Sequence, residues 1–294
     1  MTSDSPLVRL RLDFAYDGTD FSGWAMQPGL RTVQGELEAA LRMMLRSDRA
    51  RLTVGGRTDT GVHARGQVAH LDVTEDEFQR WSALRAEPSG TLDIEHVRAR
   101  RLNGVLKLRA RDISIHSVRV VPRAFDARFS AMRRRYEYRL RDEAARRDPL
   151  TARFTADVPR KLDLAAMQRA SDDLLGLNDF TSFCKAREGA TAVRDLLCFE
   201  WRVTEDGAYS ARIEADAFCH SMVRALVGSV VGVGAGRIGE AELRDLRHAR
   251  LRTSRFTVMP AQGLSLEEIR YPADDEVGER AELTRARRRL EDQG

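Results

Sequence analysis

Asp59 is the only carboxylate in the glycine-rich stretch of residues 55–64, where Arg57 stands two positions before it and hydroxyl residues flank it on both sides. The three glycines of this stretch allow positive φ angles or a very close approach to another molecule. The pattern therefore indicates a tight loop that presents one acid, which can act as a nucleophile or take a proton. A lone Asp in such a loop more often bonds to its local backbone and forms a turn, so both roles remain open here.

Arg224 lies within the apolar stretch of residues 218–232, which predicts a helix over about 219–233. Arginine is almost never buried without a partner, because an unpaired buried charge is strongly destabilising. Arg224 is therefore expected either to face a carboxylate, or to pack its aliphatic stem on apolar neighbours while its guanidinium reaches solvent.

Basic and aromatic residues are interleaved between Arg128 and Tyr138. RNA-binding proteins use this mixture, because cations hold phosphates while aromatic rings stack on exposed bases. Tyr136 and Tyr138 share one face of the strand that we predict at 135–140, where they either contact a base or pack in the core.

The composition is that of a soluble globular protein. The chain has 294 residues, of which 42% are hydrophobic and 32% charged, with a net charge of +4 and a pI of about 9.2, and this length allows two domains. Its clustered arginines suit phosphate backbones, although the excess of Arg over Lys could reflect genome composition alone. No apolar run approaches the roughly 20 residues of a membrane helix, and the N-terminus lacks the features of a signal peptide, so we expect a cytoplasmic location.

The cysteines and histidines suggest neither a disulfide framework nor a metal site. Cys184, Cys198 and Cys219 show no C-x-x-C spacing, and so small and odd a set predicts reduced thiols in a cytoplasm. The six histidines are scattered, without the H-x-E and C-x-x-C pattern of a zinc deaminase. We therefore expect no metal and no cofactor.

Hydrophobic periodicity predicts two cycles of strands and helices. Alternating apolar residues predict a half-buried strand over 8–16, Asp206-Gly207 predicts a hairpin turn, and Asn103-Gly104 predicts a helix stop. The other expected strands are 51–54, 66–73, 112–120, 135–140, 196–204, 208–217 and 263–269, and the expected helices are 33–46, 76–106, 162–175, 219–233 and 239–249.

This order favours an α+β fold of two ferredoxin-like, RRM-like units rather than a parallel βαβ ladder. We expect an N-terminal α+β domain over 1–121 that carries the Asp59 loop, and a C-terminal α+β domain over 122–272 that completes the active-site cleft. Residues 273–294 are highly charged with few apolar groups, which predicts a solvated, frayed tail.

Residues 56–64 resemble the catalytic loop of the tRNA pseudouridine synthase A family. The resemblance spans about residues 8–271, and its other motifs, in the family's order, are 16–24, 128–136, 179–183, 217–224 and 260–264. It implies a pseudouridine synthase fold with an extended, mostly antiparallel central sheet and flanking helices. It also implies a homodimer whose subunits both touch the tRNA, with uridines at tRNA positions 38 to 40 of the anticodon arm as substrates.

The same resemblance assigns roles that the patterns above leave open. Asp59 would be the nucleophile, Arg224 would pair with it, and Tyr136 would be the catalytic aromatic residue that contacts the target base. The remaining substrate contacts would be Arg57, Arg128 and Leu264, the last as an apolar wall.

The chain departs from the family pattern at a few positions. Thr60 stands where the family usually has Ala, and Ser221 and Ala225 differ from the commoner His and Asn around Arg224. Residues 76–111 form a longer segment than in compact members. These departures affect the expected detail of the contacts with the substrate, but not the reaction that the resemblance implies.

Pseudouridine formation fits these residues, and other chemistries fit them less well. The reaction breaks the N1–C1′ bond, turns the uracil and joins its C5 to C1′, after the base has left the stack. Asp59 could attack the sugar or take a sugar proton, and Asp59 or a Tyr-bound water could remove the C5 proton. A glycoside hydrolase would need two carboxylates flanking the bond, whereas this loop offers one. A non-catalytic RNA-binding module explains the basic and aromatic residues, but not an acid loop together with an arginine inside a helix.

Overall fold

The computed structural model describes residues 6–83, 93–185, 191–251 and 253–291. They divide into two compact units. Unit 1 consists of the described part of Met1–Ala131 together with Tyr271–Arg285, and unit 2 of Met132–Arg270 with the described part of Ala286–Gly294. Residues 122–131 and 271–285 thus lie in unit 1, whereas the sequence predicts a second domain over 122–272 and a tail over 273–294.

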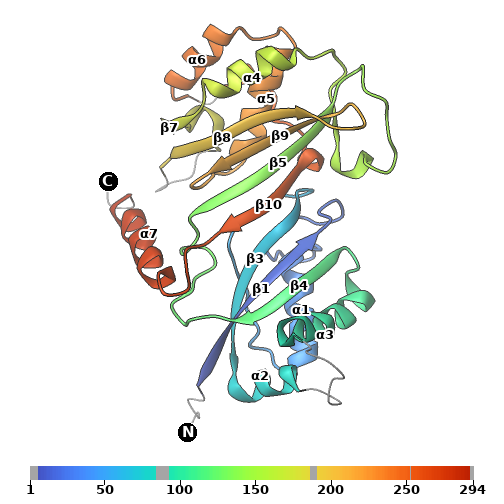
Figure 1. Cartoon of the computed structure of the whole chain (residues 1–294), viewed down its shortest axis with the longest axis vertical. Helices are drawn as coiled ribbons and strands as arrows, with labels where there is room; N and C mark the ends of the chain where they lie inside the picture. The colour runs from blue at the N-terminus through green and yellow to red at the C-terminus, as the bar shows by residue number, and fades with distance from the viewer. Residues whose placement is uncertain (1–5, 84–92, 186–190, 252, 292–294) are drawn as a thin grey trace. The chain divides into compact units, whose positions relative to one another are not determined.

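The strands of unit 1 form an antiparallel sheet and are β1 (Leu7–Tyr16), β2 (Thr53–Val54), β3 (His63–Thr74) and β4 (Ile113–Val120) (Figure 1). β1 pairs with β3 on one side and with β4 on the other, and β2 pairs with β3. Every second residue of β1 from Leu10 to Tyr16 is buried, which confirms the predicted period of two.

The helices of unit 1 are α1 (Val33–Leu45), α2 (Glu75–Ser82) and α3 (Ile94–Arg109). α1 begins after Thr32, whose Oγ1 accepts a hydrogen bond from Gly35 N at 3.2 Å, as expected of an N-cap. α3 packs against α1 and β4.

The predicted helix stop at Asn103-Gly104 is wrong, because α3 continues to Arg109. Gly104 has open space around it, so the helix tolerates it. Asn103 uses its amide to bond both backbone groups of Ile115, at 2.7 and 2.8 Å. The middle of the single helix predicted over 76–106, residues 84–92, lies outside the described residues.

The strands of unit 2 are β5 (Arg133–Arg141), β6 (Ala156–Asp157), β7 (Gly176–Asp179), β8 (Val193–Val203), β9 (Tyr209–Ala215) and β10 (Leu264–Arg270). Their order is β10-β5-β9-β8-β7, all antiparallel, with the short β6 parallel to β5. The predicted hairpin is confirmed, since Gly207 has φ 78° and Gly207 N donates to Thr204 O at 2.9 Å. The two units therefore confirm the α+β class with mostly antiparallel strands.

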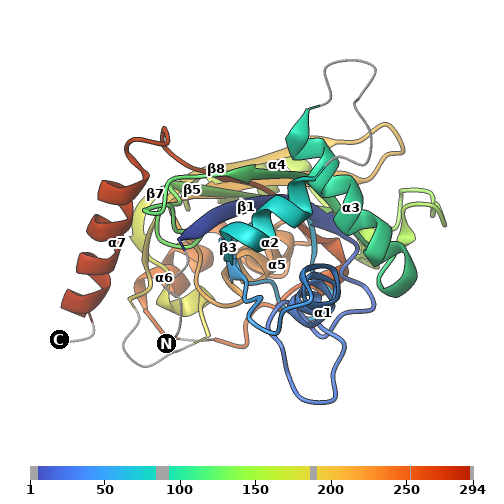
Figure 2. The ribbon, with the colours of Figure 1, turned by 90° about the horizontal axis from the view of Figure 1, so that it is seen from below.

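The helices of unit 2 are α4 (Leu164–Asp172), α5 (Met222–Gly234) and α6 (Glu240–His248). α4 packs on α5 and on β8, and Figure 2 shows α5 on one side of the unit 2 sheet. Apart from Arg224, every residue of α5 is buried. Such an all-round apolar helix is typical of a core helix. No helix in the described part of the chain combines the length and the apolar character that crossing a bilayer requires.

The C-terminal segment differs from the solvated, frayed tail that we expected. It forms the helix α7 (Val277–Glu291), which lies in unit 1 as far as Arg285. Val277 and Ala281 are each 1% exposed, and their spacing of four residues gives α7 one short apolar face.

The expectation of reduced thiols is wrong for two of the three cysteines. A disulfide joins Cys184, which follows the 3-10 helix η2 (Thr181–Phe183), to Cys219, while Cys198 is free. The two bonded cysteines are 35 residues apart. No spacing rule predicts such a pair, because only the fold of unit 2 brings η2 beside the start of α5.

Candidate active site

The Asp59 loop connects β2 to β3 as a tight turn. Gly61 has φ 77°, which favours glycine, and Val62 N donates to Asp59 O at 3.1 Å. Arg57 is exposed, Asp59 is half-buried and Thr58 between them is buried. The loop therefore presents Arg57 and Asp59 while Thr58 anchors it.

Residues 18–24 brace the back of this loop. Trp24 N donates to Thr58 O at 3.1 Å. A Cβ atom on Gly18 would lie 2.0 Å from Val62 O, so only glycine permits this approach of the two chain segments. The close packing restricts the loop backbone, which favours a fixed position for the acid that it carries.

A buried polar network lies beneath the loop. Tyr16 Oη is 2.7 Å from Thr58 Oγ1, and Gln67 Nε2 donates to Tyr16 Oη at 3.2 Å and to Gly56 O at 2.8 Å. Burial raises the pKa of Tyr16 to about 12, although its hydrogen bonds to Thr58 and Gln67 oppose this. Tyr16 is therefore a neutral hydrogen-bonding support. The alternation of β1 predicted that Tyr16 is buried, but no sequence signal identified its partners or Gln67.

Arg224 is half-buried in the first turn of α5 and fixes a neighbouring loop of unit 2. Its Nε donates to Met259 O at 2.6 Å, and Met259 N donates back to Arg224 O at 3.1 Å. A Cβ on Gly228 would lie 1.8 Å from Thr257 O, so this loop approaches the helix as closely as a glycine allows. The guanidinium thus uses one donor to hold its position, and its pairing with Asp59 remains a prediction.

Tyr136 and Tyr138 have different surroundings although they share one face of β5. Tyr138 is fully buried, and its Oη donates to Pro260 O at 2.8 Å. Burial raises the pKa of Tyr138, and the charge of Arg224 opposes that shift. The two side chains lie close together, because they donate to the adjacent carbonyls of Pro260 and Met259. Tyr136 is 8% exposed, and its ring meets the Phe218 ring edge-on, with centroids 5.1 Å apart.

Leu264 begins β10 directly opposite Tyr138 in the sheet register. It is buried, as an apolar wall would be. Gly263 precedes it, and a Cβ there would lie 2.6 Å from a ring atom of Tyr138, so the chain passes tightly over this tyrosine. Unit 2 therefore brings Leu264, Tyr138 and Arg224 into one cluster.

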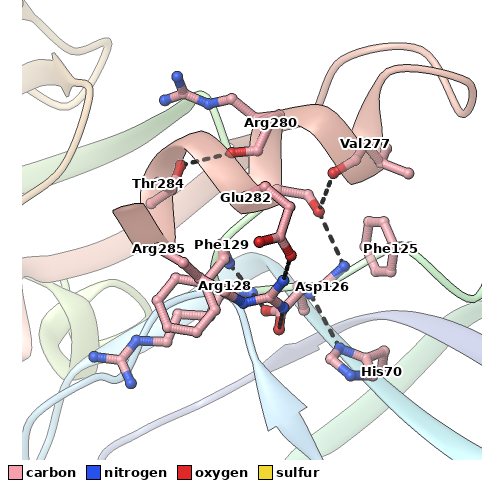
Figure 3. Close-up of polar contacts among 12 residues, drawn as sticks. His70, Phe125, Asp126, Arg128, Phe129, Val277, Arg280, Glu282, Thr284 and Arg285 are labelled. Carbon is pink, nitrogen blue, oxygen red and sulfur yellow. Dashed lines mark hydrogen bonds and ion pairs between the residues drawn. The ribbon is translucent and has the colours of Figure 1, made fainter. Parts of the chain in front are cut away.

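Arg128 lies in unit 1, in a loop organised by Asp126 (Figure 3). The Asp126 Oδ1 atom accepts hydrogen bonds from the backbone N atoms of Arg128 and Phe129, both at 2.9 Å. The Arg128 guanidinium lies 5.3 Å from the centre of the Phe129 ring, a cation–π distance. Sequence reasoning missed Asp126, although an Asp that precedes a loop of this kind is a common turn former.

The predicted site residues thus divide between the two units. Unit 1 carries Arg57, Asp59 and Arg128, and unit 2 carries Tyr136, Arg224 and Leu264. Among the described residues, no group of three or more His, Cys, Asp or Glu side chains is placed to hold a metal ion.

Comparison with known proteins identifies the family. The sequence profile of a family described as tRNA pseudouridine synthase matches residues 170–272. A tRNA pseudouridine synthase A of Leifsonia xyli subsp. xyli is 52% identical over 288 residues, which cover 96% of this chain and 98% of that protein. The chain belongs to the tRNA pseudouridine synthase A family. Family members of Frankia casuarinae and Cutibacterium acnes are 50% and 48% identical, over 95% and 96% of this chain and 95% of each relative.

The likeness to solved structures is much weaker. A Cbf5–Nop10–Gar1 complex matches 93% of this chain and 61% of that chain, at 12% identity and a TM-score of 0.35. A likeness of this size carries no argument about the site, so the family assignment depends on the sequence relatives.

Proposed function

We propose that this protein isomerises uridine to pseudouridine in tRNA, with Asp59 as its central catalytic residue. The observation that carries the proposal is the braced Asp59 loop: one carboxylate, half-exposed, on a turn fixed by Gly61 and by the approach of Gly18 to Val62 O. A loop that only made a turn would not require the buried network of Tyr16, which supports it from below. Relatives about 50% identical over nearly their whole length bear the same family name.

The reaction conserves atoms, so it needs no cofactor. The N1–C1′ bond breaks, the uracil turns, and C5 bonds to C1′, while the C5 proton leaves and N1 takes a proton. Asp59 attacks C1′ or takes a sugar proton, and Arg224 stabilises its charge. Tyr136 contacts the flipped base and takes part in removing the C5 proton.

The other residues bind the substrate and exclude water. Leu264 provides an apolar wall that keeps water from C1′ while the uracil is detached. Arg57 and Arg128 contact the RNA, where guanidinium groups suit phosphate oxygens. Binding of tRNA should therefore weaken as salt rises, through release of counterions.

The finer proposal concerns the substrate site and the assembly. We infer that the uridines lie at positions 38, 39 and 40 of the anticodon arm, that the enzyme is a homodimer, and that it is cytoplasmic. The support for these points is the resemblance of residues 8–271 to the family. Mapping the modified sites in tRNA tests the uridine positions, and the mass of the protein in solution tests the homodimer.

Release of tritium from C5-labelled uridine in tRNA tests the central proposal, because few reactions other than pseudouridine formation break the C5–H bond. We expect release together with pseudouridine in the digested product. A protein that binds tRNA with no release and no pseudouridine would instead be the non-catalytic RNA-binding module, the alternative that the family relationship does not favour.

A further inference from the structure

The disulfide between Cys184 and Cys219 ties η2 to the linker of residues 216–221, which joins β9 to α5. The Cα atoms of the two cysteines are 5.7 Å apart, a usual separation for a disulfide. Beside it, Lys185 N donates to His220 O at 3.1 Å. The disulfide and this backbone hydrogen bond thus connect the linker to the residues that follow η2.

This linker leads directly to two groups of the proposed active site. Phe218 stands before Cys219, and its ring meets Tyr136 at an interplanar angle of 89°. Ser221 has φ 63°, a left-handed conformation that L side chains rarely adopt and that the surrounding structure must maintain. α5 starts at the next residue and carries Arg224 in its first turn. Cys219 thus stands between Phe218, which contacts Tyr136, and the first turn of α5, which carries Arg224.

We propose that Cys184 and Cys219 are a reversible redox pair, and that their oxidation slows the reaction by holding Phe218 against Tyr136. The proposal rests on the function proposed above, in which Tyr136 contacts the target uracil. The Phe218 ring lies against the Tyr136 ring at a right angle, with centroids 5.1 Å apart, so a base that contacts Tyr136 from the side of Phe218 has to displace Phe218. The disulfide restrains this displacement, whereas two thiols leave the linker held by noncovalent contacts.

Thiol–disulfide exchange supplies the chemistry. Cys219 is less buried than Cys184, so its thiolate attacks a low-molecular-weight disulfide R–S–S–R first and releases one R–S⁻. Cys184 then attacks the mixed disulfide and releases the second thiolate. The two protein thiols lose two electrons and two protons in all, and R–S–S–R becomes two R–SH. Intracellular disulfides are usually transient or redox-sensing, and the same exchange runs backwards when reduced thiol is in excess.

The test compares the protein treated with dithiothreitol and with oxidised glutathione. Mass spectrometry of digested protein reports the 184–219 cross-link, and single-turnover tritium release from labelled tRNA reports the rate. We expect oxidation to lower the rate about ten- to a hundredfold, the scale at which displaced active-site contacts act, and dithiothreitol to restore it. The variants Cys184→Ser and Cys219→Ser should show no loss on oxidation. Cys198→Ser, which removes the free cysteine outside the pair, should respond as the wild type does.

Three results would overturn the proposal: no 184–219 cross-link after oxidation, a cross-linked protein as fast as the reduced one, or serine variants that lose activity like the wild type. A reduced protein that releases no tritium would instead refute the proposed function. Hydrogen exchange of residues 216–221 then decides the redox part by itself, since slower exchange after oxidation supports a restrained linker and equal exchange refutes it.

Discussion

Arg285 Nη2 lies 2.9 Å from Asp126 Oδ2, so an ion pair fastens the C-terminal helix α7 to the loop that presents Arg128 (Figure 3). Ser130 Oγ adds a second tie by donating to Val277 O at 2.9 Å. The Arg285 guanidinium also lies 5.1 Å from the centre of the Phe129 ring. α7 is thus connected to the Arg128 loop by charge, by a hydrogen bond and by an aromatic contact.

Replacing Arg285 with Met should raise KM for tRNA more than it lowers kcat, because it loosens the loop that holds a binding residue rather than the reacting groups. The Asp126 side chain is 13% exposed, so losing its cation should cost about 1–3 kcal/mol of unfolding free energy. Glu282→Gln is the matched control. Glu282 pairs with Arg285 from a side chain that is 69% exposed, and such surface pairs contribute about 0–1 kcal/mol. Equal effects of the two changes on KM and on urea unfolding would show that α7 does not position Arg128.

The tail illustrates what the sequence could not predict. Its charged residues correctly indicated a polar surface. The segment nevertheless packs as a helix, because Val277 and Ala281 are buried and Arg285 pairs with Asp126, more than 150 residues earlier in the chain. Long-range partners of charged residues leave no local pattern. The same limit explains the disulfide of Cys184 and Cys219, since nothing in their spacing specifies that η2 and the α5 linker meet.

Local patterns predicted other features well. The glycines predicted the turn of the Asp59 loop, and alternation predicted the buried face of β1, because both follow from backbone geometry alone. The network of Tyr16 and Gln67 beneath that loop was not predictable, since it depends on the register between β1 and β3. Which predicted site residues share one unit likewise followed only from the fold.

His70 should make stability depend on pH. Burial, and secondly the charge of Arg9, lower the pKa of His70 to about 4, while Asp126 and Asp72 oppose the shift. The neutral ring accepts a hydrogen bond from Ala127 N at its Nδ1, at 3.0 Å. A histidine in the unfolded chain titrates near 6.5, so between about pH 6.5 and 4 the unfolded state takes up a proton that the folded state refuses.

This contribution is complete above about pH 6.5 and is lost as the pH falls to about 4, by up to roughly 3 kcal/mol. His70→Asn keeps an acceptor where Nδ1 stands and cannot titrate. Urea unfolding of both proteins between pH 7.5 and 4.5 should show the wild type losing stability relative to the variant as the pH falls. A constant difference across this range would show that His70 takes up its proton equally in both states.

Asp59→Asn should abolish turnover while leaving the fold and tRNA binding intact. The change is nearly isosteric, and the turn is closed by the backbone oxygen of Asp59, which the variant keeps. Tritium release should fall to well under about a tenth of the wild-type rate, because an amide is neither a nucleophile nor a base here. Asp48→Asn, at an exposed carboxylate of the same unit, controls for loss of charge and should retain full activity.

Arg224→Ala should reduce both activity and stability. The variant leaves Met259 O without its hydrogen-bond donor, which should lower the free energy of unfolding by about 1–3 kcal/mol. This is less than the roughly 3–5 kcal/mol that breaking a fully buried ion pair costs, because Arg224 is only half-buried. Arg224→Lys keeps the charge but not the planar donor geometry, so it should restore activity only in part. Arg237→Ala, an exposed arginine of the same unit, is the control. Normal tritium release by Arg224→Ala would separate this residue from Asp59.

Tyr136 can be tested for stacking and for proton transfer with two substitutions. If its ring only stacks on the flipped uracil, Tyr136→Phe should keep most of the activity, and Tyr136→Ala should lose about 1–3 kcal/mol of base contact. If its hydroxyl takes part in removing the C5 proton, directly or through water, Tyr136→Phe should lower the single-turnover rate by roughly 10²–10⁴ with normal tRNA binding. We expect the second result, because stacking alone requires no hydroxyl. The edge-on contact with Phe218 does not depend on that hydroxyl, so Tyr136→Phe should preserve the packing of this face. Equal rates for the wild type, Tyr136→Phe and Tyr136→Ala would place Tyr136 outside the active site.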